Sequence, residues 1–345
     1  ETGLEDNAGR GTMTIAAATS LAASQRISLE AGDSGFGDLV FAGAGTSLAA
    51  DEIELRAGSD ESSRNSDTND RSRVVGLQTQ TVSLRDATGG IFGDAGSSAL
   101  AFRFRQAAGI DAEVDLPTLS QFGFGVGESF RAAGDVEYAV RSDEGQIDLD
   151  DSIAGTNEAD RFRNAALSLI GSESGTEAAI RVSADTAFVG KHVELGGVGS
   201  FRFDSDLARV FNRTGTDANE SLTLRSGVGG AGNLSFDGDG GPVLVKAPSV
   251  RLIAGDGPDG ESDSSISTGD ASFDLSGPVG AERTFAYQMD GSFNANDLPD
   301  VAQFVGGALG LPSVLAIRND SGLIKINDFD AAALPIGLAN GPARL

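Results

Sequence analysis

The chain has 345 residues, which is enough for two or three compact domains or for one elongated array of repeats. It is strongly acidic: 25 Lys and Arg residues stand against 51 Asp and Glu residues, and the formal net charge is −26. This charge argues against binding to nucleic acid, because phosphates require a basic surface. The sequence contains no Cys, which excludes disulfide scaffolds, thiol catalysis and thiolate metal sites.

The composition also argues against large helices and against a membrane span. Gly contributes 48 residues and Trp none, a balance that favours turns and thin coils. No run of 18 apolar residues is present, and the most apolar stretch, 301–317, is interrupted by Gln303 and Pro312. The sequence therefore predicts no transmembrane segment. The first residues show no initiator Met and no signal-peptide pattern, which favours a mature product or a piece of a longer chain.

A short repeat opens the chain. Leu21 and Leu48 occupy the same position in two copies of one phrase, 27 residues apart. In the second copy Ile53 and Leu55 share one face while the intervening polar residues share the other, and this period of two predicts half-buried strands. The strand phrases recur at 13–32, 39–58, 179–184 and 243–255.

A longer repeat contains these phrases. The segment 102–151, which includes Leu116-Pro117, is echoed by 285–328, which includes Leu298-Pro299. We therefore predict a first long repeat at 1–200 and a second at 201–345, joined as one continuous solenoid without a flexible linker. An Asp precedes each Leu-Pro pair and is a good helix cap, so one short helix is expected after each of these Asp residues.

The predicted fold class is all-β: a parallel β-helix, or β-solenoid, with short helical and loop excursions. A phrase that recurs after 27 residues fits one coil of a solenoid. Tandem β-sandwich repeats are the alternative, and they would favour longer repeats of roughly 90–100 residues. A duplicated compact domain is a further alternative.

The apolar-x-apolar strands, the Ala-Gly and Ala-Pro bends and the phrase LVKAPSVRLIAGDG at 244–257 resemble the repetitive stalks of filamentous-haemagglutinin-type exoproteins. Bacteria release these proteins through two-partner secretion or related routes, and the resemblance covers about half of the chain. It implies a right-handed parallel β-helix that is secreted or associated with the cell surface. It also implies a structural or adhesive role, with neighbouring repeats, further copies, or cell-surface and matrix glycans as partners.

Residues that carry catalysis are sparse. The single His, His192, has no second His or Cys with which to build a metal site or a catalytic triad. Paired carboxylates such as Asp148, Asp150 and Asp151 are the residue type that hydrolyses glycosides. Sugar-cleaving grooves, however, usually stack the sugar on Trp or Tyr, and the chain has no Trp and two Tyr. A β-helical carbohydrate-active enzyme is therefore the third choice of function.

Calcium is the cofactor that the sequence suggests, because Asp-rich loops containing Gly supply the oxygen ligands that this ion prefers. Solvated acidic turns are the competing interpretation and the favoured one. The candidate groups are Asp237 with Asp239; Asp256 with Asp259 and Glu261; Asp148 with Asp150 and Asp151; and Asp328 with Asp330.

The leading functional expectation is a non-enzymatic structural or adhesive segment that assembles into, or forms part of, an elongated fibre or surface layer. The reason is physical: the open ends of a solenoid present unpaired strands to which further coils can add. A Ca²⁺-stabilised extracellular binding module is the alternative.

Overall fold

The computed structural model describes residues 11–32, 36–58, 72–84, 100–117, 121, 136–149, 165–172, 179–182, 192–198, 201–202, 210–211, 221–228, 230–236, 243–255, 264–269, 271–277, 282–290, 293–294, 298–305, 312–319 and 324–325.

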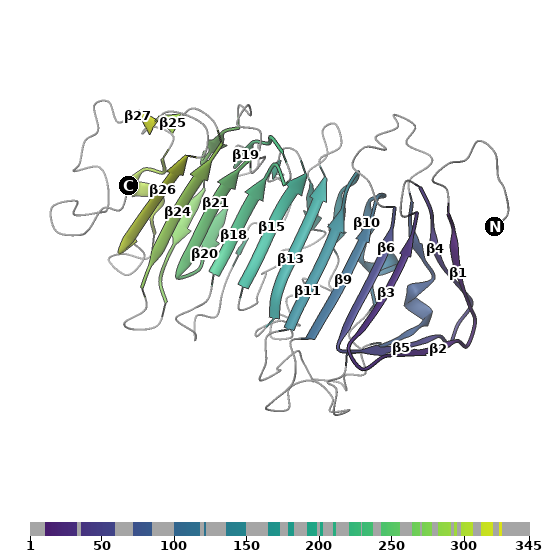
Figure 1. Ribbon diagram of the computed structural model, residues 1–345. Helices are drawn as coiled ribbons and strands as arrows, with labels where there is room; N and C mark the ends of the chain where they lie inside the picture. Colours follow the sequence, from purple (N-terminus) through teal and green to yellow (C-terminus); the bar gives the residue numbers. More distant parts are fainter. Residues whose placement is uncertain are drawn as a thin grey trace.

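Ten parallel strands form one long sheet that runs the length of the molecule (Figure 1). They are β3 (Arg26–Ala31), β6 (Glu52–Ala57), β9 (Leu100–Gln106), β11 (Val136–Ser142), β13 (Ala165–Ser172), β15 (His192–Val198), β18 (Ser221–Ser226), β21 (Ser249–Ala254), β24 (Thr284–Met289) and β26 (Val314–Asn319). Their order in the sheet is their order in the chain, so each coil adds one strand.

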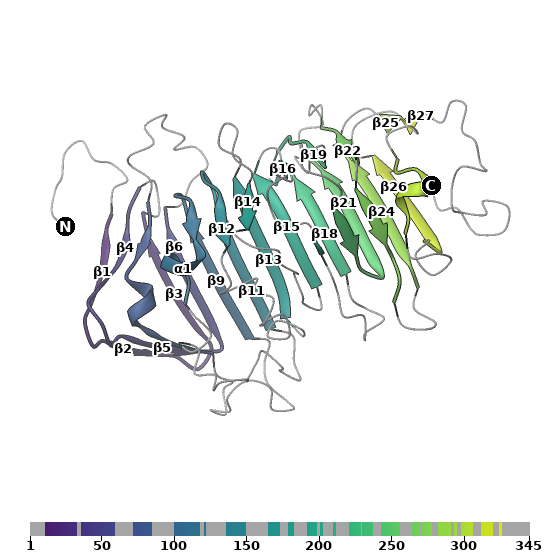
Figure 2. The same cartoon turned by 180° about the vertical axis from the view of Figure 1, so that it is seen from behind.

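Shorter strands, also parallel, form the two other sides of the coils (Figure 2). The side that follows the long sheet in each coil contains β1 (Met13–Ala16), β4 (Leu39–Ala42), β7 (Val74–Val75), β10 (Ile110–Asp111), β12 (Ile147–Leu149), β14 (Ile180–Val182), β16 (Phe201–Arg202), β19 (Leu234–Ser235), β22 (Ile266–Ser267), β25 (Phe293–Asn294) and β27 (Ile324–Lys325). The third side contains β2 (Ser20–Ala22), β5 (Ser47–Ala50), β8 (Thr81–Leu84), β17 (Val210–Phe211), β20 (Leu244–Lys246) and β23 (Ser272–Asp274). The short helices that lie wholly within the described residues are η2 (Leu77–Thr79), α1 (Ala112–Asp115) and η5 (Val301–Gln303).

The molecule is a right-handed parallel β-helix, as predicted. In Figure 1 the strands of the front sheet point upwards and succeed one another from right to left, and the chain returns behind them. All strand pairs in the described residues are parallel, from β1 with β4 at one end to β24 with β26 at the other, which rules out antiparallel sandwich repeats for this part of the chain. The long sheet passes residue 200 without a break, because β15 pairs with β18.

The register of the first coils is the one that the repeated phrases indicate. Leu21 lies beside Leu48, and Ile27 beside Ile53. The two Leu-Pro segments also follow strands of the same long sheet, since Phe102 lies in β9 and Phe285 in β24. The division of the chain into two long repeats stays a prediction.

The core is a set of apolar columns inside the coils. One column passes through all ten strands of the long sheet and is buried except at its two ends. Its members are Leu29, Leu55, Phe104, Val140, Leu169, Leu195, Leu224, Leu252, Tyr287 and Ile317. Each fully buried side chain of this size contributes about 1.5–3 kcal/mol, so the column is a principal source of stability.

The corners between coils are held by glutamines at the ends of short 3₁₀ turns, of which Gln80 is buried and Gln303 half-buried. Gln80 accepts a hydrogen bond from the Thr46 backbone N–H (2.8 Å) and donates one to the Gly43 carbonyl (2.9 Å), both in the preceding coil. Gln303 donates in the same way to the carbonyls of Gly269 (2.9 Å) and Ala271 (3.0 Å). The Gln80 oxygen thereby satisfies the Thr46 N–H, which is buried and would otherwise have no partner there.

The helix expected after Asp115 falls largely on residues 118–120, which lie outside the described residues; Gln121, just beyond them, is in 3₁₀ conformation. The helix α1 ends at Asp115, ahead of Leu116-Pro117, because the residue preceding a Pro disfavours the helical conformation. The side chain of Asp115 accepts a hydrogen bond from the Asp111 N–H (3.0 Å). In the second segment η5 does follow Leu298-Pro299.

Candidate interaction surfaces

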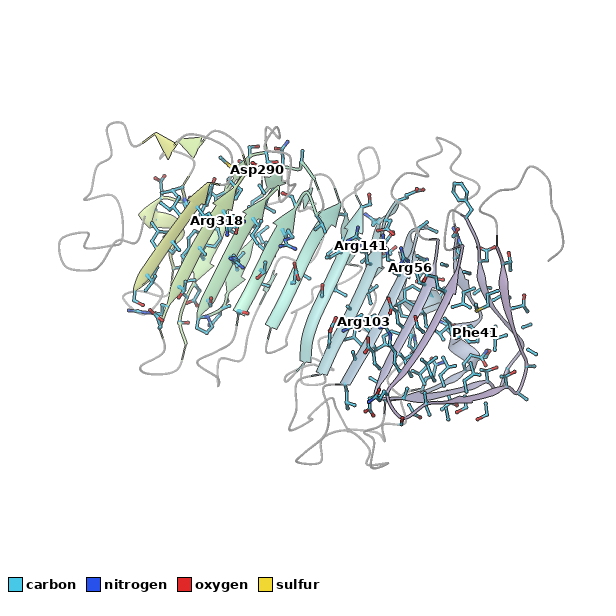
Figure 3. All side chains as sticks on the ribbon, in the orientation of Figure 1. Phe41, Arg56, Arg103, Arg141, Asp290 and Arg318 are labelled. Atoms are coloured by element: carbon cyan, nitrogen blue, oxygen red, sulfur yellow. The ribbon has the colours of Figure 1, made fainter. Side chains whose placement is uncertain are left out.

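The outer face of the long sheet carries rows of paired charges over its first four strands (Figure 3). Arg103 in β9 bridges Glu52 of the preceding strand and Glu137 of the following one, with a distance of 2.6 Å from its Nη2 to the Glu137 Oε2. Arg26 in β3 pairs with Glu52 and Glu54. The hydrogen bond to Glu137, followed by the charges of Glu137 and Glu52, raises the pKa of Arg103 despite its partial burial.

A second row stacks three arginines on successive strands. Arg56, Arg105 and Arg141 are register neighbours in β6, β9 and β11. Asp143 lies between two of them, with one carboxylate oxygen 2.6 Å from the Arg105 Nε and the other 2.6 Å from the Arg141 Nε. Glu30 pairs with Arg56 at 2.9 Å. These ion pairs offset the repulsion between the three neighbouring arginines.

The last four strands of the same face differ, because β18, β21, β24 and β26 contain no Asp or Glu. Arg225 pairs back to Glu194 of β15 at 3.4 Å. Arg251 is exposed, and its register neighbours are Thr223 and Ala286. Small and hydroxyl-bearing residues fill much of the remaining outer surface here: Ser221, Ser249, Thr284 and Ala316.

The charge on the long sheet is therefore opposite in sign to that of the whole chain. Its strands carry eight of the 25 basic residues and five of the 51 acidic ones, a balance of +3 against −26 for the chain. The basic residues are Arg26, Arg56, Arg103, Arg105, Arg141, Arg225, Arg251 and Arg318, and the acidic ones are Glu30, Glu52, Glu54, Glu137 and Glu194. The excess of acid lies elsewhere on the chain, which makes this flat face a distinct surface.

The first coil forms a second candidate surface. Within the described residues no strand lies beyond β1, β2 or β3. Several apolar side chains of this coil, Ile15, Leu21 and Leu29 among them, are only partly buried and pack against the core. Their register neighbours one coil later are buried, with Leu48 and Leu55 at 0 % exposure. Within the described residues, the coil thus presents partly exposed apolar side chains and strand edges without a neighbouring strand.

Of the ten predicted calcium ligands, nine lie outside the described residues: Asp150, Asp151, Asp237, Asp239, Asp256, Asp259, Glu261, Asp328 and Asp330. The tenth, Asp148, is half-buried in β12 and lies between Asp111 and Arg181 in the register. In the described part of the chain, no three His, Cys, Asp or Glu side chains gather closely enough to hold a metal ion. The calcium site stays a prediction.

His192 is the first residue of β15, where its register neighbours are Ala166 and Ser221. Neither of these two register neighbours is an acidic or basic residue. The expectation that this His is not catalytic stays a prediction.

Two partly buried carboxyl groups have shifted pKa values of opposite sign. Burial alone would raise the pKa of Asp274, but hydrogen bonds from Ser276 and Lys246 hold it below its usual range; the Lys246 Nζ lies 3.2 Å away. Burial raises the pKa of Asp115, and this outweighs the hydrogen bond from the Asp111 N–H. The Lys246–Asp274 pair joins β20 to β23, so it acts between coils.

Alkaline pH is expected to destabilise the protein through Tyr138. Burial raises the pKa of this phenol, which is 1 % exposed, so folding favours its neutral form. The stability that depends on Tyr138 is complete below the unfolded-state pKa of about 10 and is lost as the pH rises above it. Urea unfolding between pH 8 and pH 11 should show a steeper loss for the native chain than for Tyr138→Phe. Equal slopes for the two proteins would contradict this expectation.

Sequence reasoning missed the charged rows on the long sheet. The signal was present, since Glu and Arg alternate with apolar residues in 52–57 and Arg does so in 102–105. The partners, however, lie far apart in the chain: Glu52 and Arg103 are 51 residues apart, and Arg103 and Glu137 are 34 apart.

Comparisons of this chain with protein-family models, with curated proteins and with solved structures found no match. The structure therefore places the chain in a fold class, the right-handed parallel β-helices, and the comparisons add no family to it. No helix in the described residues is long and apolar enough to cross a membrane.

Proposed function

We propose that this chain is a non-enzymatic structural and adhesive segment of a secreted or cell-surface repeat protein, forming part of an elongated fibre or surface layer. The observation that carries the proposal is the uninterrupted sheet of ten parallel strands, with an apolar column that passes through all ten and is buried between its two end strands. Because each coil contacts only its neighbours, such an array gains length without a new fold. The resemblance of the strand phrases to filamentous-haemagglutinin-type stalks supports the same role.

We assign the adhesive role to the outer face of the long sheet from β18 to β26. An exposed Arg among hydroxyl-bearing side chains offers a charge and hydrogen-bond donors to the carboxylate or sulfate groups of cell-surface or matrix glycans. The acidic loops predicted to bind Ca²⁺ would stiffen the array in this role, and the ion is part of the proposal for that reason.

The shape test is electron microscopy of the purified chain in millimolar calcium and again with a chelator. Rods or fibres support the proposal. If the rods bend or shorten on chelation, calcium is part of the structure; if they do not change, the ion is removed from the proposal. Compact particles in both conditions, or the release of reducing ends from a panel of polysaccharides, would overturn it.

Adhesion is tested with immobilised polygalacturonate and dextran sulfate as probes. We expect Arg251→Glu to lower binding to these anionic glycans severalfold, because it reverses the charge of an exposed side chain on the proposed surface. Arg73→Glu is the matched control, since Arg73 is also exposed but lies outside the long sheet. Equal losses in the two variants would show a general charge effect and contradict adhesion through this face.

A further inference from the structure

We propose that two copies of this chain join end to end, with β3 of one copy added beside β26 of the other as the next strand of the long sheet. This inference rests on the proposed function and names its partner, a second copy of the chain. The contact is heterologous, because different ends of the two copies meet, and its repetition would build a fibre.

The backbone groups at the two ends are in phase for parallel pairing. The Gln25 and Ala31 carbonyls accept hydrogen bonds from β6 and the residue after it, from the Glu52 N–H (2.8 Å) and the Gly58 N–H (2.9 Å). Since successive residues of a strand turn their N–H and C=O groups to opposite edges, those of Arg26, Ser28 and Glu30 face away from β6.

The same alternation applies to β26. Its Val314 N–H donates to the Arg283 carbonyl (3.0 Å) beside β24, so Val314 and every second residue after it turn towards β24. The backbone groups of Leu315 and Ile317 therefore face the other edge. Within the described residues no strand occupies that edge of β26 or the free edge of β3.

Side chains match when the register of the sheet is extended across the junction. The Leu29 column begins at β3 and ends at Ile317 in β26, so Leu29 of the second copy would lie beside Ile317. Ile27 would lie beside Leu315 in the same way. Leu29, Leu315 and Ile317 are only partly buried in one copy, and stacking would remove their remaining apolar surface from water.

The charges at the junction are complementary. In the outer row that begins with Glu30 in β3, the last residue is Arg318 in β26. Continuing the row places Glu30 of the second copy beside Arg318, which repeats the Glu30–Arg56 contact already present between β3 and β6. If two like ends met, β3 against β3 or β26 against β26, the two strands would be antiparallel, and the rows of side chains would not continue from one copy to the other.

Cysteine cross-linking tests both the contact and its polarity, because the chain contains no Cys. Ser28→Cys and Ala316→Cys place thiols on the outer faces of β3 and β26, on neighbouring strands of the proposed junction. Within one copy they are nine strand spacings apart, about 43 Å. A mixture of the two variants treated with a short bismaleimide should give a covalent dimer, and each variant alone should not.

Several results would overturn the proposal. A cross-link in Ser28→Cys alone would show that like ends meet. Thiols that fail to react with a monofunctional maleimide would show that the chain's own residues, 1–10 or 326–345, cover the ends. Reactive thiols without cross-linking at the highest soluble concentration would show that the ends do not meet.

Charge reversal gives an independent test. We expect Glu30→Arg and Arg318→Glu each to lower the association constant about two- to fivefold in sedimentation velocity, the range of an exposed ion pair. The double variant should recover the loss. Arg251→Glu, on the same sheet but away from the ends, is the matched control and should leave association unchanged. Additive losses in the double variant would contradict the pairing of Glu30 with Arg318.

Failure of this inference is distinguishable from failure of the proposed function. Rods that remain monomeric would remove end-to-end stacking and leave the structural role intact. Cleavage of a polysaccharide would remove the proposed function and leave the stacking test unaffected.

Discussion

Replacing Phe273 with alanine is expected to lower the free energy of unfolding by about 3–5 kcal/mol, the range for a fully buried Phe. Phe273 lies in β23 at 0 % exposure. Its ring is surrounded by three others, with centroid distances of 5.1 Å to Phe285, 5.7 Å to Phe304 and 6.1 Å to Phe236. These rings come from three successive coils, so the cavity left by alanine would loosen all three.

The loss should be local as well as large. Because coils of a solenoid contact only their neighbours, unfolding is not required to be two-state along the array, and hydrogen exchange is the appropriate readout beside urea unfolding. We expect faster exchange in β19 to β26 and unchanged protection in β3 and β6. Val75→Ala is the control, since Val75 is 45 % exposed and its loss should cost less than about 0.5 kcal/mol. Uniformly faster exchange, or a loss no larger than that of the control, would contradict the role given to Phe273.

The strands of this fold were predictable because two patterns coincide in them. Apolar residues alternate with polar ones in 27–31 and 53–57, and a parallel register places equal positions of successive coils side by side. Ile27 therefore lies beside Ile53, and residues at equal positions of the repeated phrase are the ones that stack. The same logic holds in β18, where Leu222 and Leu224 point inward between half-buried polar residues.

The register of later coils was harder to predict because the loops vary. The positions that pair in the long sheet are 26 residues apart between Ile27 and Ile53, 49 between Ile53 and Phe102, and 36 between Phe102 and Tyr138. A fixed repeat length cannot capture such spacings. Strand pairing holds the register, while the connections between strands are free to change length.

The candidate surfaces were less predictable than the strands, for a related reason. The contact between Arg105 and Asp143 depends on the length of the coil that separates them, so no local pattern reveals it. The buried amide of Gln80 likewise reaches Gly43 and Thr46 one coil earlier. By contrast, the acidic turns chosen as calcium ligands have a clear local signal, but only Asp148 lies in the described residues.

Gly171→Ala is expected to destabilise the protein by about 3 kcal/mol, the upper end of the usual range for over-packing. Gly171 lies near the end of β13, and a Cβ at this position would be 1.9 Å from the Ala179 carbonyl oxygen. That oxygen cannot withdraw freely, because it accepts the hydrogen bond from the Ile147 N–H (3.0 Å) that joins successive coils. The substitution must therefore shift backbone or break the bond between β12 and the following coil, and neither change is relieved by a side-chain rotation.

The matched control for this substitution is Gly230→Ala, since no atom lies within 4 Å of the Cβ that it would add. Urea unfolding and hydrogen exchange of the two variants separate the effect of space from the general cost of replacing Gly. We expect Gly230→Ala to change the free energy of unfolding by less than about 0.5 kcal/mol, and Gly171→Ala to speed exchange at Ile147 and its neighbours. If both variants unfold at the same urea concentration as the native chain, the Ala179 carbonyl does not lie close to the Gly171 Cα. The coils at this corner would then not be closely stacked, which contradicts the packing described for the rod.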